Sequence, residues 1–204
     1  MYNTVSTPTE FLVKHINIGN WNALLLYYSI ILLIATIPVI YFIKRKKIWV
    51  KISGFVLSFS ILGIGFWLNP IYSNDWEIGG KEVQAEMYQN LFDSIPNKAI
   101  VFADPNCYHC EGLLKTLMAM KNQIKPQSIL IIFNDLDAEQ EEKYRAKFSE
   151  IFSIISIPSN EFMDYTQGRF PMVLLYDQQK KIAQWYNSNL GLKSLDYIVN
   201  QCSQ

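Results

Sequence analysis

The hydrophobic residues of this chain fall into two zones with different patterns. Residues 21–72 are almost all apolar, whereas residues 73–204 mix apolar and polar positions as a soluble domain does. Within the first zone, Trp21–Ile43 carries no charged residue and is long enough for a helix that crosses a bilayer. A second apolar segment, at about residues 50–72, has the same character. The pattern predicts a two-helix transmembrane hairpin in front of a soluble domain.

A short basic loop between the two apolar segments sets their predicted orientation. Residues 44–49 contain the basic run Lys44–Lys47, and basic loops between membrane spans stay in the cytoplasm. Segment 1–20 and the soluble domain are then expected outside the cytoplasm. In a bacterium this describes a two-pass inner-membrane protein with its C-terminal domain in the periplasm. A buried hairpin of a soluble protein is disfavoured, because both segments are long and lack amphipathic spacing.

After a linker at residues 73–80, the domain at 81–204 shows helix and strand patterns in turn. Apolar runs predict four strands, which are Lys98–Ala103, Ser128–Phe133, Met172–Tyr176 and Lys181–Tyr186. The last two flank a tight turn at 177–180 and should pair antiparallel. Helical spacing predicts helices, which run from Val83 to near Pro96, from Cys107 to Pro126, over Asp137–Phe152 and over Ser194–Gln201, with Ser194 as an N-cap. Residues 154–167 are expected to be irregular.

Composition narrows the possible functions. The chain has 18 basic and 18 acidic residues, and this balance gives no reason to expect a nucleic-acid partner. The soluble zone is long enough for one hydrophobic core of its own. Its three cysteines are too few for a disulfide framework. Two of them, Cys107 and Cys110, form one motif, and Cys202 near the end is expected to be a free thiol.

The Cys-Tyr-His-Cys motif lies in the stretch Ala99–Leu114, where a buried strand, a polar turn and a helix start follow one another. Cysteines at positions i and i+3 of a helix start lie on one face, close enough to form a disulfide. Cys107 occupies the position where free backbone N–H groups and the helix dipole favour a thiolate. The stretch therefore predicts a dithiol redox site made by Cys107 and Cys110.

A metal site is the first alternative for this motif. Structural zinc needs about four ligands, and besides the two motif cysteines the chain offers only His15, His109 and Cys202 as soft ligands. No second pair of closely spaced cysteines or histidines exists, so no structural metal is expected. The polar turn in front of Cys107 also disfavours two merely buried, apolar cysteines.

The order of predicted elements resembles the thioredoxin-like superfamily over about residues 81–202. Two motifs carry the resemblance, Phe102–Cys110 and Phe170-Pro171 just before a hairpin strand. The resemblance implies an α/β thioredoxin-like domain, with a central mixed sheet flanked by helices, and a cis Pro171 that faces the dithiol. The chain departs from the family at Val101, where many members have a buried acid. Asp104 or Glu111 could substitute for that acid, which in the family accepts the proton of the second cysteine, but both are expected to be solvated.

This resemblance implies a membrane-anchored, periplasmic thiol–disulfide oxidoreductase. Cys107 would form a mixed disulfide with the substrate, and Cys110 would resolve it. Phe170 and Pro171 would bind the substrate segment as an added strand, and Tyr108 and His109 would tune the site. The redox-active Cys107–Cys110 disulfide would serve in place of a cofactor. The expected partners are cysteine-containing exported proteins and a membrane redox partner.

Two functions of other classes stay open from the sequence. The domain could bind a client or an assembly partner without essential redox turnover, in which case a variant lacking both motif cysteines would keep its phenotype. Alternatively, Cys107, Cys110 and His109 could hold a soft ion such as Cu(I) for delivery, which metal content would reveal.

Overall fold

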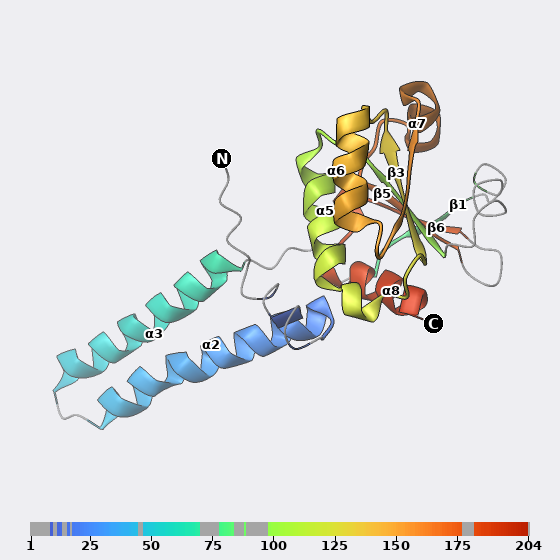
Figure 1. The fold of residues 1–204 in the computed structure, drawn as a ribbon. Helices are drawn as coiled ribbons and strands as arrows, with labels where there is room; N and C mark the ends of the chain where they lie inside the picture. Colours follow the sequence, from blue (N-terminus) through green and yellow to red (C-terminus); the bar gives the residue numbers. More distant parts are fainter. Residues whose placement is uncertain are drawn as a thin grey trace. The chain divides into compact units, whose positions relative to one another are not determined.

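The computed structural model describes residues 9, 12, 13, 16, 18–44, 47–69, 78–83, 88, 98–176 and 182–203. The chain divides into two compact units, Met1–Tyr72 and Ser73–Gln204. The first unit contains a pair of long helices, and the second contains a sheet with helices around it (Figure 1).

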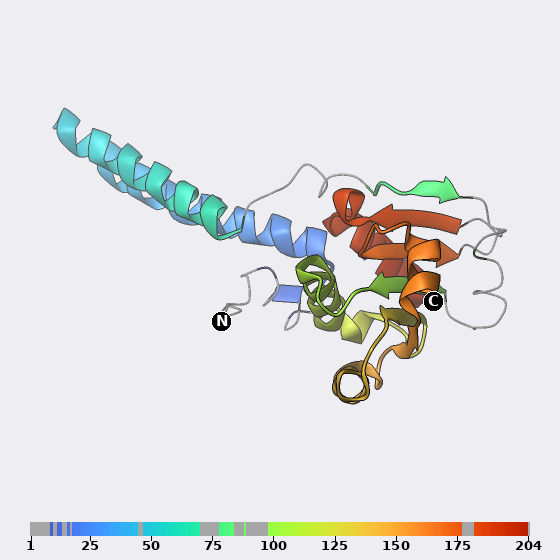
Figure 2. The same cartoon turned by 90° about the horizontal axis from the view of Figure 1, so that it is seen from above.

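The first unit contains two helices that are long and apolar enough to cross a membrane, α2 (Asn20–Ile43) and α3 (Ile48–Leu68). They run side by side in both views (Figures 1 and 2). The predicted bounds of the first helix are confirmed to within one residue. The second helix was predicted to reach residue 72 but ends at Leu68, because Asn69 precedes Pro70 and a residue before proline disfavours the helical conformation.

Small residues and backbone acceptors hold α2 and α3 together. The Ser58 hydroxyl donates to the Ala35 carbonyl at 2.6 Å, and the Tyr27 hydroxyl donates to the Gly65 carbonyl at 2.9 Å. A Cβ atom at Gly65 would lie 3.0 Å from the Ile31 side chain. Close backbone approach and hydrogen bonds between helices are the usual means of helix association in lipid.

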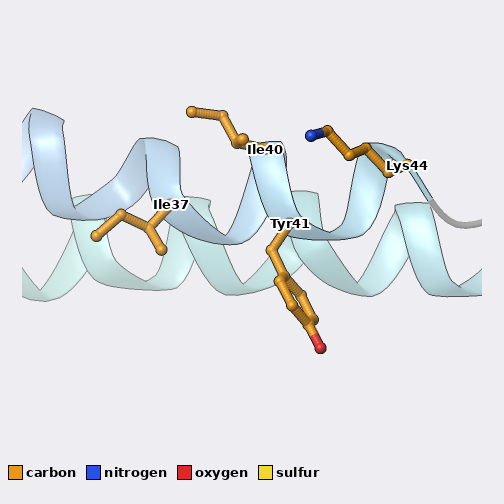
Figure 3. Close-up of a pocket in the computed structure, with 4 residues that line it drawn as sticks. All are labelled: Ile37, Ile40, Tyr41 and Lys44. Carbon is orange, nitrogen blue, oxygen red and sulfur yellow. The ribbon is translucent and has the colours of Figure 1, made fainter.

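An open hollow lies along α2 near its C-terminal end. It is lined by Ile37, Ile40, Tyr41 and Lys44. Figure 3 shows Ile40 and Lys44 projecting to the same side, one turn apart, while Tyr41 points to the other side. A tyrosine and a lysine at the end of an apolar helix match the composition of a membrane–water interface.

The second unit is built on a mixed six-stranded sheet with the strand order β1-β6-β5-β2-β3-β4. The strands are β1 (Lys81–Val83), β2 (Ala99–Ala103), β3 (Ile129–Asn134), β4 (Ser153–Ile157), β5 (Met172–Tyr176) and β6 (Ile182–Tyr186). The neighbours β2, β3 and β4 are parallel, whereas β5 runs antiparallel to both β2 and β6. The predicted mixed sheet and the antiparallel pairing of the last two predicted strands are confirmed.

Helices cover both faces of this sheet. They are α5 (Tyr108–Ala119), α6 (Ala138–Phe148), α7 (Ser159–Thr166) and α8 (Leu192–Ser203). Phe102 of β2 contacts Phe162 of α7, and Phe133 of β3 contacts Tyr144 of α6. Phe102 pairs with Ile132, so Phe102 and Phe133 point to opposite faces, since successive strand residues alternate. All five residues of β2 are therefore buried, as expected for a strand covered on both sides.

Two edge strands were missed by the sequence patterns. Residues 154–167 were predicted to be irregular, but they contain all of β4 except its first residue, and all of α7. Val83 was predicted to begin a helix, but it ends β1, which pairs antiparallel with β6. Tyr88 is helical, and the rest of that predicted helix lies outside the described residues, as does the predicted turn at 177–180.

Three predicted helix ends need correction. The helix after the cysteines stops at Ala119 and continues as a 3-10 turn, η2 (Lys121–Gln123). Helix α6 ends at Phe148, before the predicted Phe152, and Asp137 is its N-cap, with a side chain that accepts from the N–H of Gln140. Ser194 is not an N-cap, because α8 begins at Leu192 and the buried Ser194 hydroxyl instead donates to the Ile78 carbonyl at 2.6 Å.

The same substitution, glycine to alanine, should change the free energy of unfolding in opposite directions at two positions of the second unit. Gly80 has a φ of +96°, and a Cβ there would lie 2.7 Å from Trp185, whereas a Cβ at Gly112 of α5 would meet open space. Gly80→Ala should lower the free energy of unfolding by about 1–3 kcal/mol. Gly112→Ala should raise it by about 0.5–1 kcal/mol. Thermal unfolding of the full chain in detergent, followed by tryptophan fluorescence, checks both, and equal shifts would contradict the local geometry.

Candidate functional site

The two motif cysteines lie close together at the start of α5. Strand β2 ends at Ala103, the turn follows, and Cys107 is the N-cap of α5. The Cys107 sulfur accepts a hydrogen bond from the backbone N–H of Cys110 at 3.2 Å. Cys107 is half-buried, whereas Cys110 is only 1% exposed. The arrangement gives one thiol that a partner can reach and one thiol shielded behind it.

The Cys110 thiol is held in its neutral form by its surroundings. Burial raises the pKa of this thiol above its usual range, and a hydrogen bond with the Cys107 side chain acts in the same direction. The backbone N–H of Asp104, 3.4 Å from the Cys110 sulfur, lowers the same pKa, while the charge of Asp104 raises it. Cys110 is therefore a poor nucleophile until it loses its proton.

Tyr108 and His109 lie between the cysteines and face outward. Tyr108 is 75% exposed, and its ring meets the His109 ring edge to face, with centroids 5.7 Å apart. An exposed aromatic side chain next to a reachable thiol offers apolar contact to whatever approaches Cys107. Both residues predicted to tune the site thus lie between the two cysteines in the sequence and are exposed at the surface.

Phe170 and Pro171 reach the same edge of the sheet as the cysteine turn. The Phe170–Pro171 peptide bond is cis, as the resemblance implied. Met172 pairs with Phe102 in the antiparallel β5–β2 ladder, so Pro171 lies beside the end of β2, next to the turn that carries the cysteines. Phe170 is half-buried and rests on Phe162 of α7, with ring centroids 5.7 Å apart.

Of the two acids expected to be solvated, only Glu111 is. Glu111 forms an exposed ion pair with Lys115 at 2.8 Å. The Asp104 carboxylate is instead half-buried, accepting from the side-chain amide of Asn134 at 2.7 Å and from the backbone N–H of Asn106 at 2.8 Å. Asn134 was not singled out by the sequence patterns. Its position as the last residue of a buried strand is the one signal that could have identified it.

The remaining predicted soft ligands are Cys202 and His15. Cys202 is fully buried on α8, and burial raises the pKa of its thiol to about 11, although a hydrogen bond with Ser128 opposes the shift. Cys202 is a free thiol, as expected, but its expected place in an exposed tail is wrong, because it belongs to the core. His15 lies outside the described residues. Within the part of the chain that the structure describes, no three His, Cys, Asp or Glu side chains group as a metal site.

Comparison of the sequence with protein-family models gave no match, and comparison with curated proteins gave no relative.

The burial of the three cysteines predicts the order in which they react. In the reduced full chain, Cys107 should be alkylated by iodoacetamide on the order of tenfold or more faster than Cys110 and Cys202. Alkylation of Cys110 should rise only toward high pH, because its pKa is raised and little thiolate exists near neutrality. Peptide mapping by mass spectrometry resolves the three sites, with the protein unfolded in guanidinium as the control. Equal rates in the folded protein would contradict the observed burial.

Proposed function

We propose that this chain is a membrane-anchored thiol–disulfide oxidoreductase whose redox group is the Cys107–Cys110 pair. The observation that carries the proposal is the asymmetry of this pair, with a reachable N-cap thiol backed by a buried thiol three residues on. The mixed sheet, the cysteine helix after β2 and the cis proline before β5 support a thioredoxin-like domain.

The proposed reaction begins at Cys107. Its thiolate attacks one sulfur of a substrate disulfide, and the other substrate sulfur leaves as a thiolate that takes up a proton from water. Cys110 then gives up its proton to solvent and attacks the Cys107 sulfur. This releases the second substrate thiolate and forms the Cys107–Cys110 disulfide. The substrate gains two electrons, the protein loses two, and the reverse sequence introduces a disulfide.

The direction of this exchange depends on the reduction potential of the pair. A value near −270 mV, roughly that of thioredoxin, makes the protein a reductant, and a value near −120 mV makes it an oxidant. In this proposal His109 shifts the potential by stabilising the Cys107 thiolate relative to the uncharged disulfide. Tyr108, exposed beside Cys107, contributes apolar contact to the substrate.

The substrate is proposed to be a cysteine-bearing exported protein that binds along the Phe170–Pro171 segment. This segment borders the end of β2 and the cysteine turn, so an extended chain bound there is within reach of Cys107. The backbone supplies binding that does not depend on sequence, as in other cases of strand addition.

The membrane topology is a further part of the proposal. Helices α2 and α3 are apolar enough to cross a membrane, and the basic run Lys44–Lys47 supports a cytoplasmic loop between them. Added protease should therefore digest the second unit in intact bacterial spheroplasts. A cytoplasmic marker protein that survives the same treatment is the control. Digestion that needs lysis of the membrane would place the second unit in the cytoplasm.

Single cysteine variants test the two proposed roles. Cys110→Ala should accumulate mixed disulfides through Cys107, because the intermediate loses the thiol that resolves it. Cys107→Ala should trap no partner, because Cys110 is buried. Non-reducing electrophoresis of the full chain, with mass spectrometry of the adducts, gives the readout, and Cys202→Ala is the matched control. Equal trapping by both motif variants, or by neither, would contradict the roles.

A further inference from the structure

A polar residue lies at or just after the end of each of three parallel strands of the sheet, and these residues meet. Ala103, the last residue of β2, pairs with Phe133 of β3, so Asp104 and Asn134 follow at neighbouring strand ends. Asn134 pairs with Ile157, the last residue of β4, and Ser159 begins α7 two residues later. Because carboxyl ends of parallel strands share one edge of a sheet, Asp104, Asn134 and Ser159 are brought together by register.

Hydrogen bonds join these three side chains in one direction. The Ser159 hydroxyl donates to the Asn134 side-chain oxygen at 2.7 Å, and the Asn134 side-chain nitrogen donates to the Asp104 carboxylate at 2.7 Å. The second carboxylate oxygen accepts from the Asn106 N–H at 2.8 Å. Both oxygens therefore accept from N–H donors, which fixes the orientation of the carboxylate.

The side-chain hydrogen bonds end at the Asp104 carboxylate, and the backbone of the same residue contacts the buried sulfur. The backbone N–H of Asp104 donates to the Cys110 sulfur at 3.4 Å, so one residue provides both a donor and a fixed negative charge beside this thiol. Two further titratable groups interact electrostatically here. Cys107, in the same turn, acts on the Cys110 thiol, and Tyr144 of α6 interacts with Cys110, Asp104 and Glu111. Among these groups, Asp104 is the acid whose side chain the strand ends hold in place.

We propose that Ser159, Asn134 and Asp104 form a positioning chain that fixes a carboxylate charge beside Cys110 and so reserves Cys107 as the attacking thiol. The inference rests on the proposed redox function and adds a control that the cysteine motif itself does not contain. A fixed negative charge disfavours a second thiolate in the same turn. Cys110 then stays neutral until the mixed disulfide has formed, and it resolves this intermediate by losing its proton to solvent.

The reagent 5,5′-dithiobis(2-nitrobenzoate) separates the two thiol steps in the reduced full chain in detergent. Cys107 thiolate attacks the reagent disulfide and releases one thionitrobenzoate. Cys110 loses its proton, attacks the Cys107 sulfur and releases the second, so the reagent gains two electrons and the protein loses two. The rate of the second release, measured against pH by stopped-flow absorbance, reports the Cys110 step, and the first release is the internal reference.

Asp104→Asn keeps the size of the side chain and removes its charge. The second release should become on the order of three- to tenfold faster at neutral pH, with its pH profile moved to lower pH. The first release should stay within about twofold. Asp135→Asn, the same change at an exposed acid next to Asn134, is the matched control and should leave both steps unchanged. An unchanged or slower second release in Asp104→Asn, or an equal effect of Asp135→Asn, would overturn the proposal.

Asn134→Leu tests whether Asn134 acts through Asp104. It should accelerate the second release in the parent protein, because the released carboxylate turns to water, where its charge is screened. It should add less than about twofold in the Asp104→Asn background, since coupled residues are not additive. Equal effects in both backgrounds would mean general loosening and would overturn the positioning role. A parent protein that releases only one thionitrobenzoate would instead contradict the proposed redox function itself.

Discussion

The parallel register of β2, β3 and β4 is the constraint on which the candidate site depends. These strands are covered by helices on both faces, and β2 is buried along its whole length. A shift of β2 by one residue against β3 would exchange the faces of Phe102 and its neighbours, and would also separate Asp104 from Asn134. The hydrophobic core and the polar strand ends are therefore fixed by the same pairing, and the cysteine turn follows directly from it.

The apolar runs of the central strands predicted those strands correctly, whereas the strands that depend on distant pairing were missed. The run Met172–Tyr176 is continuous and apolar, and it forms β5 with the predicted bounds. Strand β1 has only three residues, two of them charged and exposed, so nothing in its own composition marks it. It exists because β6 pairs with it. Strand β4, at the other edge of the sheet, was missed for a similar reason, because serines interrupt its apolar run.

In the candidate site, too, one feature follows from local spacing and another depends on strand pairing. The closeness of Cys107 and Cys110 followed from their spacing at a helix start, which requires no knowledge of the sheet. The contact between Asp104 and Asn134 required knowing that β2 and β3 are neighbours in parallel register. Sequence reasoning therefore treated Asp104 as a solvated turn residue. Polar residues that end buried parallel strands are better considered together, because the sheet brings their side chains to one edge.

Under the proposed redox function, the residues of the two units limit how electrons enter the protein. The predicted spans contain no acid and no histidine, and the hydrogen bonds of α2 and α3 that join the helices end on backbone carbonyls. On the proposed topology, this composition suits a membrane anchor. In the second unit Cys110 and Cys202 are buried. In the proposed exchange reaction, a partner therefore brings its own sulfur to Cys107, next to the exposed Tyr108 ring.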